Sequence, residues 1–344
     1  MKVVVTGATG NAGTAVVRAL AADPAVTDVL GVARRLPELR VPGVRWAAAD
    51  VDPGHEDLTA LFGGADAVVH LAWKFQPTHD PVATWRTNVL GSVRVFEACA
   101  RAGVPALVHA SSVGAYSPGP ADGRPVDESW PTHGWPGAAY TREKAYLERY
   151  LDGFEAAHPG IRLVRMRPAF LFKEESASEQ RRIFAGPLLP WRLIRPGLLP
   201  ALPAVRGLRF QALHTDDAAE AYRAAVVRPV HGPFNLVADP VLDTAAIAAL
   251  LHARTVPLPA GAARAALAAA WRMHLVPAAP GLLDAVLRLP LLDAGRARDA
   301  LGWVPGATAT EAVAEFLEGL RRGAGAATAP LHPASAGAGG SAVR

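Results

Sequence analysis

The sequence predicts an α/β protein with a doubly wound parallel sheet and a smaller C-terminal α/β lobe. Three observations lead to this prediction. Short apolar runs alternate with helical segments through the first half of the chain, a glycine-rich turn joins the first run to the first helical segment, and the alternation weakens beyond residue 170. Strands that alternate with helices form parallel sheets covered by helices on both faces. With 344 residues, of which 51% are hydrophobic, the chain can build such a core.

The first half contains six apolar runs that are bounded by turn signals, and we expect each to be a strand. These strands are Val3–Thr6, Val29–Ala33, Val44–Ala49, Ala67–Ala72, Ala106–Ser111 and Arg162–Arg167. The helices expected among them are Thr14–Ala22, Glu56–Phe62, Ala83–Ala102 and Ala139–Ala157. A stretch rich in Pro and Gly at residues 114–137 is expected to be a loop, and loops of this length are uncommon unless they are functional.

The second half has weaker patterns. Strands are expected at Leu208–Leu213 and Phe234–Val237, and helices at Asp217–Val227, Thr244–His252, Ala262–His274 and Thr310–Arg322. We therefore expect residues 1–170 to form the sheet domain, to which some later segments return, and residues 171–322 to form a lobe over the carboxyl edge of the sheet. Residues 323–344 are mostly Ala, Gly, Ser and Pro, a composition that predicts a disordered tail.

Charge and cysteine content exclude several classes of protein. The 35 basic and 31 acidic residues leave a net charge of +4, and the basic residues are scattered, so we expect no nucleic-acid partner. No uncharged apolar run approaches the roughly 18 residues of a membrane-spanning helix, and the amino terminus has no signal-peptide pattern. We expect a soluble cytoplasmic protein without a membrane partner. The single cysteine, Cys99, excludes an intramolecular disulfide, and no metal-ligand spacing is present, so we expect no metal.

The glycine-rich turn has the spacing typical of a dinucleotide-binding Rossmann domain. Gly7, Gly10 and Gly13 are three residues apart between the first strand and the first helix. The first glycine allows a tight turn, the second lets a pyrophosphate approach the backbone, and the third lets the helix pack on the strand. The helix begins after this turn, so the unpaired backbone N–H groups at Asn11 and Ala12 can bind the phosphates. The alternative is an ordinary glycine-rich turn, which its position after the first strand disfavours.

The end of the second strand indicates which nicotinamide cofactor is preferred. An acidic residue at this place binds the ribose 2′-hydroxyl of NAD, whereas arginine accommodates the 2′-phosphate of NADP. Here the strand ends with Ala33, followed by Arg34 and Arg35. We therefore expect a preference for NADP over NAD. The alternative is that both arginines form a solvated strand end in an arginine-rich chain.

Tyr140 and Lys144 lie four residues apart on an expected helix, and therefore on one face of it. The chain has only four lysines against 31 arginines, so a lysine at this position suggests that an ammonium group is required. A nearby ammonium would lower the pKa of the phenol and let it act as a general acid or base. Ser111 and Ser112 end the fifth strand at the same edge, where either hydroxyl could bind a reacting oxygen; alone, such a pair is usually a turn.

In this order, these motifs resemble the NAD-dependent epimerase/dehydratase group of the extended short-chain dehydrogenase/reductase family. The resemblance rests on Thr6–Gly13, His70-Leu71-Ala72, Ser111-Ser112 with Tyr116, Tyr140-x-x-x-Lys144, Arg167-Pro168, Leu213–Ala218, Phe234–Leu236 and Leu301–Pro305. It covers about residues 1–320. It implies that Ser112, Tyr140 and Lys144 form the catalytic set.

The resemblance also implies where the cofactor would lie. It places Asp50 and Val51 at the adenine, Leu71, Ala72 and Trp73 along the cofactor, and Asn88 beneath the active site. The full set expected at the cofactor is Gly7, Gly10, Asn11, Ala12, Gly13, Arg34, Arg35, Asp50, Val51, Leu71, Ala72, Trp73, Asn88, Ser111, Tyr140, Lys144 and Pro168.

Two departures from the family pattern bear on the reaction. Sugar-nucleotide 4,6-dehydratases carry an Asp-Glu pair where this chain has Val113-Gly114, so we expect no such elimination. Residues 168–173 replace a stretch common to nucleotide-sugar enzymes, and the apolar segment Phe184–Phe210 would suit a hydrophobic carbonyl or alcohol if it lines a pocket rather than a core.

We expect an NAD(P)-dependent oxidoreductase that transfers a hydride between nicotinamide and a carbonyl or hydroxyl carbon of a small molecule, with Tyr140 as general acid or base. One alternative is a sugar or nucleotide-sugar epimerase that retains its cofactor. Another is a non-catalytic, NADP-binding redox sensor, which would have no need of the Tyr140–Lys144 pair. A homodimer is compatible with each of these functions.

Overall fold

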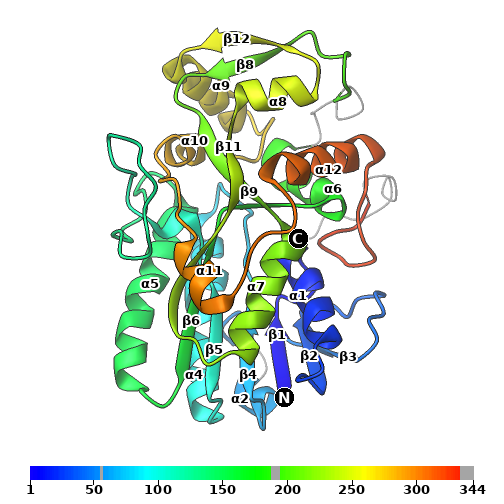
Figure 1. The fold of residues 1–344 in the computed structure, drawn as a ribbon, viewed down its shortest axis with the longest axis vertical. Helices are drawn as coiled ribbons and strands as arrows, with labels where there is room; N and C mark the ends of the chain where they lie inside the picture. Colours follow the sequence, from blue (N-terminus) through cyan, green and yellow to red (C-terminus); the bar gives the residue numbers. More distant parts are fainter. Residues whose placement is uncertain (55–56, 187–193, 334–344) are drawn as a thin grey trace.

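A seven-stranded parallel sheet forms the base of the molecule (Figure 1). The structure is a computed structural model that describes residues 1–54, 57–186 and 194–333. The strands are β1 (Lys2–Thr6), β2 (Asp28–Ala33), β3 (Val44–Ala48), β4 (Ala67–His70), β5 (Ala106–Ala110), β6 (Arg162–Pro168) and β10 (Gly232–Leu236). Their order is β10-β6-β5-β4-β1-β2-β3, and every neighbouring pair is parallel. The doubly wound sheet predicted from the sequence is confirmed, and the chain reverses its direction of winding between β1 and β4, where such sheets bind ligands.

Both faces of the sheet are buried because alternate side chains of each strand point to opposite sides. Val3 and Val5 pack under α1 (Asn11–Ala22) and α7 (Thr215–Val227), whereas Val4 packs with the helices of the other face. That face is covered by α2 (Leu58–Phe62), α4 (Gly91–Arg101) and α5 (Ala139–Ala157). The expected helix at 83–102 is instead built from α3 (Pro81–Trp85), a π-helical turn (Arg86–Leu90) and α4.

The second lobe lies beyond the carboxyl ends of the strands, at the top of Figure 1. Its sheets are β11-β9-β7 and β12-β8, made of β7 (Phe170–Phe172), β8 (Ala201–Val205), β9 (Arg209–His214), β11 (Ala238–Asp243) and β12 (Arg254–Leu258). Its helices are α6 (Ala177–Gln180), α8 (Thr244–Leu250), α9 (Ala260–Arg272), α10 (Pro280–Val286) and α12 (Ala309–Arg322). From the same half of the chain, α7, β10 and α11 (Gly295–Leu301) return to the parallel sheet.

The beginning of the expected tail is packed on the protein. Residues 323–333 fold against the body, with Thr328 and Leu331 buried, so the prediction of disorder from residue 323 is wrong for this part. A buried leucine and several backbone hydrogen bonds hold the segment, which its small-residue composition did not reveal. The remainder of the expected tail, 334–344, lies outside the described residues, as does the part of the segment 184–210 at 187–193.

Two neighbouring histidines lie in the core between the sheet and α4. His70 bonds the hydroxyl oxygens of Thr6 at 2.7 Å and Ser92 at 2.8 Å, so side chains rather than backbone satisfy it. His109 stacks on His70 with 5.6 Å between ring centroids, and neither of its ring nitrogens has a hydrogen-bond partner among the described residues. Burial lowers the pKa of His70 to about 3 and that of His109 well below its usual value.

Within the described ranges, no helix is both long enough and apolar enough to cross a membrane. The same ranges contain no group of three or more His, Cys, Asp or Glu side chains arranged to hold a metal ion.

The two buried histidines should make the protein less stable in acid. Below a pH of about 6.5 they take up protons in the unfolded chain but stay neutral in the fold, so stability present above that pH is lost as the pH falls, by about 1.4 kcal/mol per unit per histidine. His109→Leu should remove the share of this loss that His109 causes, because leucine takes up no proton. The substitution breaks no hydrogen bond of the ring within the described chain. His70→Leu should remove its share as well, but it should destabilise the protein near neutral pH by leaving the Thr6 hydroxyl without its partner.

Urea unfolding at about pH 7 and about pH 5 measures these free energies. The control is His133→Gln, at an exposed histidine, which should lose as much free energy of unfolding between the two pH values as the wild type. The prediction is contradicted if His109→Leu also loses as much as the wild type.

Candidate active site

The turn after β1 brings the first helix against the end of β4. Gly7 has a positive φ of 71°, and a Cβ atom there would lie 2.5 Å from the backbone nitrogen of Ala72. A Cβ on Gly13 would lie 2.2 Å from the carbonyl oxygen of Gly7. Neither position can hold a side chain, so both glycines are explained by close backbone packing. The carboxyl end of β4 therefore lies directly beside the turn.

Gly10 has a different environment. A Cβ atom there would meet only the carbonyl oxygen of Gly7, at an ordinary 3.6 Å. Gly10 is also the N-cap of α1, and no side chain caps the amide groups of this helix. An uncapped helix start with open space beside it fits the phosphates of a dinucleotide. The Asn11 side chain is used by the fold, since it donates to Leu171 O at 3.4 Å and accepts from Thr215 Oγ1 at 3.2 Å.

The residues expected near the adenosine lie at the ends of β2 and β3. Arg34 and Arg35 follow Ala33 and are exposed, with no carboxylate bonded to them among the contacts of the described chain. Asp50 accepts a hydrogen bond from the backbone of Asp52 at 3.0 Å, and the buried Val51 packs beneath α4. These ends share the edge of the sheet that carries the glycine turn.

The three residues expected to be catalytic meet at the end of β5. Ser112 caps a short 3-10 turn (Val113–Ala115), and a Cβ atom on Gly114 in this turn would lie 3.4 Å from Ser112 Oγ and 2.7 Å from Tyr140 Cε1. Lys144 donates to Ala110 O at 2.7 Å, and its ammonium lies 3.4 Å from the centroid of the Trp73 ring. Trp73 meets Tyr140 edge to face with 5.6 Å between ring centroids. Ser112, Tyr140 and Lys144 are therefore neighbours at the end of β5, next to the loop that follows β4.

The expected effect of Lys144 on the phenol is wrong for this structure. Burial raises the pKa of Tyr140 to about 12, although its bond to Ser112 opposes the rise. Burial also lowers the pKa of Lys144 to about 7. The ammonium lies 5.9 Å from the Tyr140 ring and bonds a backbone carbonyl instead of the phenol. Loss of water around the phenolate therefore dominates the shift of this pKa, and the negative charge of Glu143 adds to the rise.

Two donors beside the catalytic set suit a cofactor ribose. The indole Nε1 of Trp73 is buried and has no hydrogen-bond partner within the described chain. Lys144 has further N–H groups besides the one that bonds Ala110. Leu71 and Ala72, at the end of β4, are half-buried between these donors and the glycine turn.

A buried carboxylate that sequence reasoning missed lies beneath the site. Glu143 accepts hydrogen bonds from Thr84 Oγ1 and Asn88 Nδ2, both at 2.7 Å. Asn88 also bonds both the backbone N–H and the C=O of Lys74, so it holds the loop after β4. The contacts observed for Asn88 are therefore with Lys74 and Glu143 beneath the site. The signal for Glu143 was its place three residues after Tyr140, on the same face of α5.

Ser111 belongs to a different network. Its hydroxyl donates to Glu148 Oε1 at 2.5 Å, and Arg167 donates to both oxygens of the same carboxylate. Burial alone would raise the pKa of Glu148, but these bonds hold it at about 2. The expectation that Ser111 contacts the cofactor is therefore not supported by its observed bonds. Pro168 ends β6 and pairs with Leu236 of β10.

Two further aromatic side chains extend from the Tyr140 ring. The Phe75 ring stacks on Tyr140 at 5.4 Å, and Phe184 contacts Phe75 edge to face at 5.6 Å. Gln76 fastens this loop to the second lobe through Ile183 O at 2.6 Å. Phe184 lies more than forty residues after Tyr140, and its place at the site could not be read from spacing.

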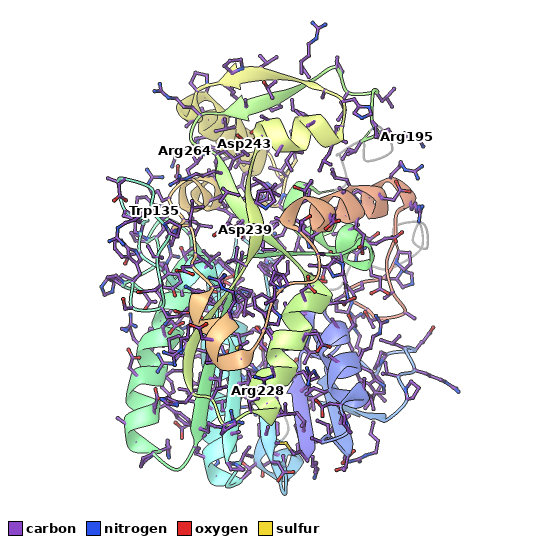
Figure 2. All side chains as sticks on the ribbon, in the orientation of Figure 1. Trp135, Arg195, Arg228, Asp239, Asp243 and Arg264 are labelled. Carbon is purple, nitrogen blue, oxygen red and sulfur yellow. The ribbon has the colours of Figure 1, made fainter. Side chains whose placement is uncertain are left out.

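The loop between Ser112 and α5 is held by the second lobe as well. Trp135, labelled in Figure 2, lies just before α5, and the guanidinium of Arg288 covers its ring at 4.1 Å. Val126 of the same loop pairs with Leu292 in an isolated β-bridge. The expected loop at 114–137 thus ties the catalytic edge to the lobe.

The chain belongs to the NAD dependent epimerase/dehydratase family, whose model matches residues 3–236. It is 26% identical over 264 residues to an uncharacterized protein of Mycobacterium tuberculosis, a match that covers 75% of this chain and 67% of that protein. It is 35% identical over 111 residues to an L-arabinose 1-dehydrogenase (NAD(P)(+)) of Haloferax volcanii, which covers 32% of this chain and 41% of that enzyme.

Solved structures share the fold over nearly the whole chain. A UDP-glucose 4-epimerase of Thermus thermophilus in complex with NAD has a TM-score of 0.69 at 21% identity, and covers 93% of this chain and 99% of that chain. A dTDP-glucose 4,6-dehydratase of Streptomyces venezuelae with NAD bound has the same TM-score and identity, and covers 94% of this chain and 97% of that chain. The extended short-chain dehydrogenase/reductase fold inferred from the motifs is confirmed.

The contact between Gly114 and Tyr140 gives a direct test of the site's geometry. A Cβ on Gly114 would lie 2.7 Å from Cε1 of the Tyr140 ring. Gly114→Ala should therefore force the ring to move and lower the free energy of unfolding by about 1–3 kcal/mol. The control is Gly153→Ala in α5, where nothing lies within 4 Å, and it should raise this free energy by about 0.5–1 kcal/mol. Urea unfolding measures both changes in free energy. The geometry is contradicted if Gly114→Ala changes the free energy of unfolding by the same amount as Gly153→Ala.

Proposed function

We propose that this protein is an NAD(P)-dependent oxidoreductase that acts on a carbonyl or hydroxyl group of a small molecule. The observation that carries the proposal is the position of Ser112 and Tyr140 side by side: a Cβ atom on Gly114 would lie 2.7 Å from Tyr140 Cε1 and 3.4 Å from Ser112 Oγ. The Tyr140 ring also contacts Trp73, the residue after Ala72, which packs against the glycine turn. When bound, a nicotinamide cofactor would supply or accept a hydride at its ring. Gly7, Gly10, Gly13 and the amide groups of Asn11 and Ala12 would hold its pyrophosphate.

The chain's own residues move the proton. In the direction of reduction, the Tyr140 hydroxyl would donate its proton to the carbonyl oxygen of the substrate, which becomes the hydroxyl oxygen of the alcohol product. With a pKa of about 12, Tyr140 is protonated at neutral pH and is ready to act as an acid. The Ser112 hydroxyl would hold the substrate oxygen by a hydrogen bond, and the Lys144 ammonium, fixed by Ala110 O, would bind the cofactor ribose.

The preferred cofactor is NADP. The support is the pair Arg34 and Arg35 at the end of β2, where a 2′-phosphate would meet two exposed guanidinium groups and no acidic residue. A preference for NADP also fits a reductant that exchanges at each turnover.

The substrate we propose is a carbonyl compound or alcohol with an apolar body. Phe75, Phe184 and Trp73 around Tyr140 would bury such a body. We do not propose 4,6-dehydration, because the acidic side chain that dehydratases carry at the position of Gly114 would collide here with the Tyr140 ring. The homodimer and the cytoplasmic location expected from the sequence stay predictions.

A retained-cofactor epimerase is the second candidate, because structural neighbours of the same family include nucleotide-sugar epimerases. The two are separated by screening carbonyl compounds and nucleotide sugars while following the absorbance of the reduced nicotinamide. An oxidoreductase consumes added NADPH in proportion to product. An epimerase converts its substrate with no net consumption.

Tyr140→Phe separates an enzyme from a redox sensor. Loss of the proton donor should slow turnover by about a hundredfold to ten-thousandfold, while dinucleotide affinity changes little. The comparison variant is Tyr146→Phe, an exposed tyrosine on α5, which should keep wild-type turnover. Turnover of the best substrate found in the screen, together with a titration of NADPH fluorescence, measures both quantities. Undiminished turnover in Tyr140→Phe would refute the catalytic role.

The double variant Arg34→Ala, Arg35→Ala tests the cofactor preference. It should weaken NADPH binding by about tenfold or more for each lost phosphate contact, and leave NADH binding nearly unchanged. Arg45→Ala is the control, since Arg45 pairs with Asp28 at the amino end of β2, away from the site. Fluorescence titrations give the ratio of the two affinities. An unaltered ratio in the double variant would overturn the assignment to NADP.

A further inference from the structure

Residues 324–333, which follow α12 and which we call the C-terminal strap, form a compact turn. Ala326 donates to Leu331 O at 2.7 Å, and Leu331 N bonds the hydroxyl of Thr328 at 3.4 Å. A Cβ on Gly325 would lie 2.1 Å from Leu331 O, so the turn closes tightly on itself. Thr328 is 2% exposed and Leu331 is 0% exposed. The strap is thus an ordered part of the molecule.

The strap contacts two separate parts of the dinucleotide site. The Thr328 hydroxyl donates to Thr9 O, inside the glycine turn, at 2.9 Å. The backbone N–H of Leu39, in the loop that begins with Arg34 and Arg35, donates to Ala327 O at 3.2 Å. One short segment therefore connects the turn that would hold the pyrophosphate with the loop that would hold the ribose phosphate.

The second lobe fastens the other side of the strap. Arg182 donates to His332 O at 2.8 Å and also to Pro330 O. Ser178 N in α6 donates to Ala324 O at 3.3 Å. The strap is consequently held by both lobes, at the edge of the sheet where the adenosine half of a dinucleotide would bind.

We propose that the C-terminal strap is the outer wall of the adenosine site, and that a dinucleotide enters and leaves only when the strap detaches from Thr9 and Leu39. This rests on the proposed function, because it assumes the dinucleotide site. The strap contains no carboxylate, so it leaves the positive charges of Arg34 and Arg35 available to a 2′-phosphate. The wall is therefore compatible with a phosphorylated ribose beneath it.

A wall of this kind affects rates more than affinity. If the strap must open before the ligand can pass, loosening it speeds entry and exit together. A segment that merely covers the surface would leave both rates unchanged. Dissociation and association rates of NADPH therefore report on the strap without any catalytic turnover.

Thr328→Val removes the hydroxyl that bonds Thr9 and keeps the shape of the side chain. Its NADPH dissociation should be roughly fivefold faster, the factor that corresponds to one hydrogen bond. Leu331→Ala, which empties the buried anchor, should accelerate dissociation at least as much. Thr310→Val on α12 is the matched control, because Thr310 makes none of the bonds that hold the strap, and it should keep the wild-type rate.

Stopped-flow displacement of NADPH by excess NADP, followed by nicotinamide fluorescence, gives these rates for the full-length chain. Hydrogen exchange at the amides of Ala326 and Leu331 gives an independent measure of how often the strap opens. It should be slowed by saturating NADPH and accelerated in Thr328→Val.

Faster dissociation and faster strap exchange in both variants, with melting temperatures close to that of the wild type, support the wall. Faster strap exchange with an unchanged dissociation rate overturns it, while leaving the proposed function intact. A wild-type chain that binds neither NADPH nor NADH overturns this inference and the proposed function together.

Discussion

The close approach of Gly7 to the backbone of Ala72 is the contact on which the rest of the site depends. It joins the start of α1, where anionic groups would bind, to the end of β4. From there the chain continues directly into Trp73, whose ring contacts both Lys144 and Tyr140. A methyl group at Gly7 would separate the two ends of the site. The phosphate end and the proton-transfer end are therefore parts of one packed unit.

The fold could be predicted well because its signal is local. Val3, Val4 and Val5 alternate between two buried faces, and the helices follow at the spacing that a parallel sheet requires. The lobe was harder to predict, since β8 and β12 are short strands, each with a proline inside, and their partners lie far apart in the sequence. The packing of residues 323–333 depends on one buried leucine, the buried Thr328 and hydrogen bonds to distant segments, none of which a periodic pattern could reveal.

At the site, residue type and spacing predicted which groups come together, but burial decided their properties. The spacing of Tyr140 and Lys144 predicted that they share one helix; both lie on α5, and Lys144 bonds Ala110 at the end of β5. It could not predict that Lys144 is buried and Tyr140 half-buried, and this loss of water reverses the expected direction of the phenol pKa. Ser111 and Ser112 are adjacent in sequence but lie beside different turns of α5: Ser111 bonds Glu148, whereas Ser112 lies near Tyr140. Partners that come from distant segments, such as Phe184, require the tertiary structure.

The missing side chain at Gly114 also constrains how this scaffold can change in evolution. Its place is filled by the ring of Tyr140, so any larger residue there needs a compensating shift of the amino-terminal turn of α5. Acquiring an acidic side chain at position 114 is consequently a two-step change, and its first step damages the existing centre. Lineages that carry this glycine should diversify by altering the aromatic surroundings of Tyr140 and keep the proton donor in place.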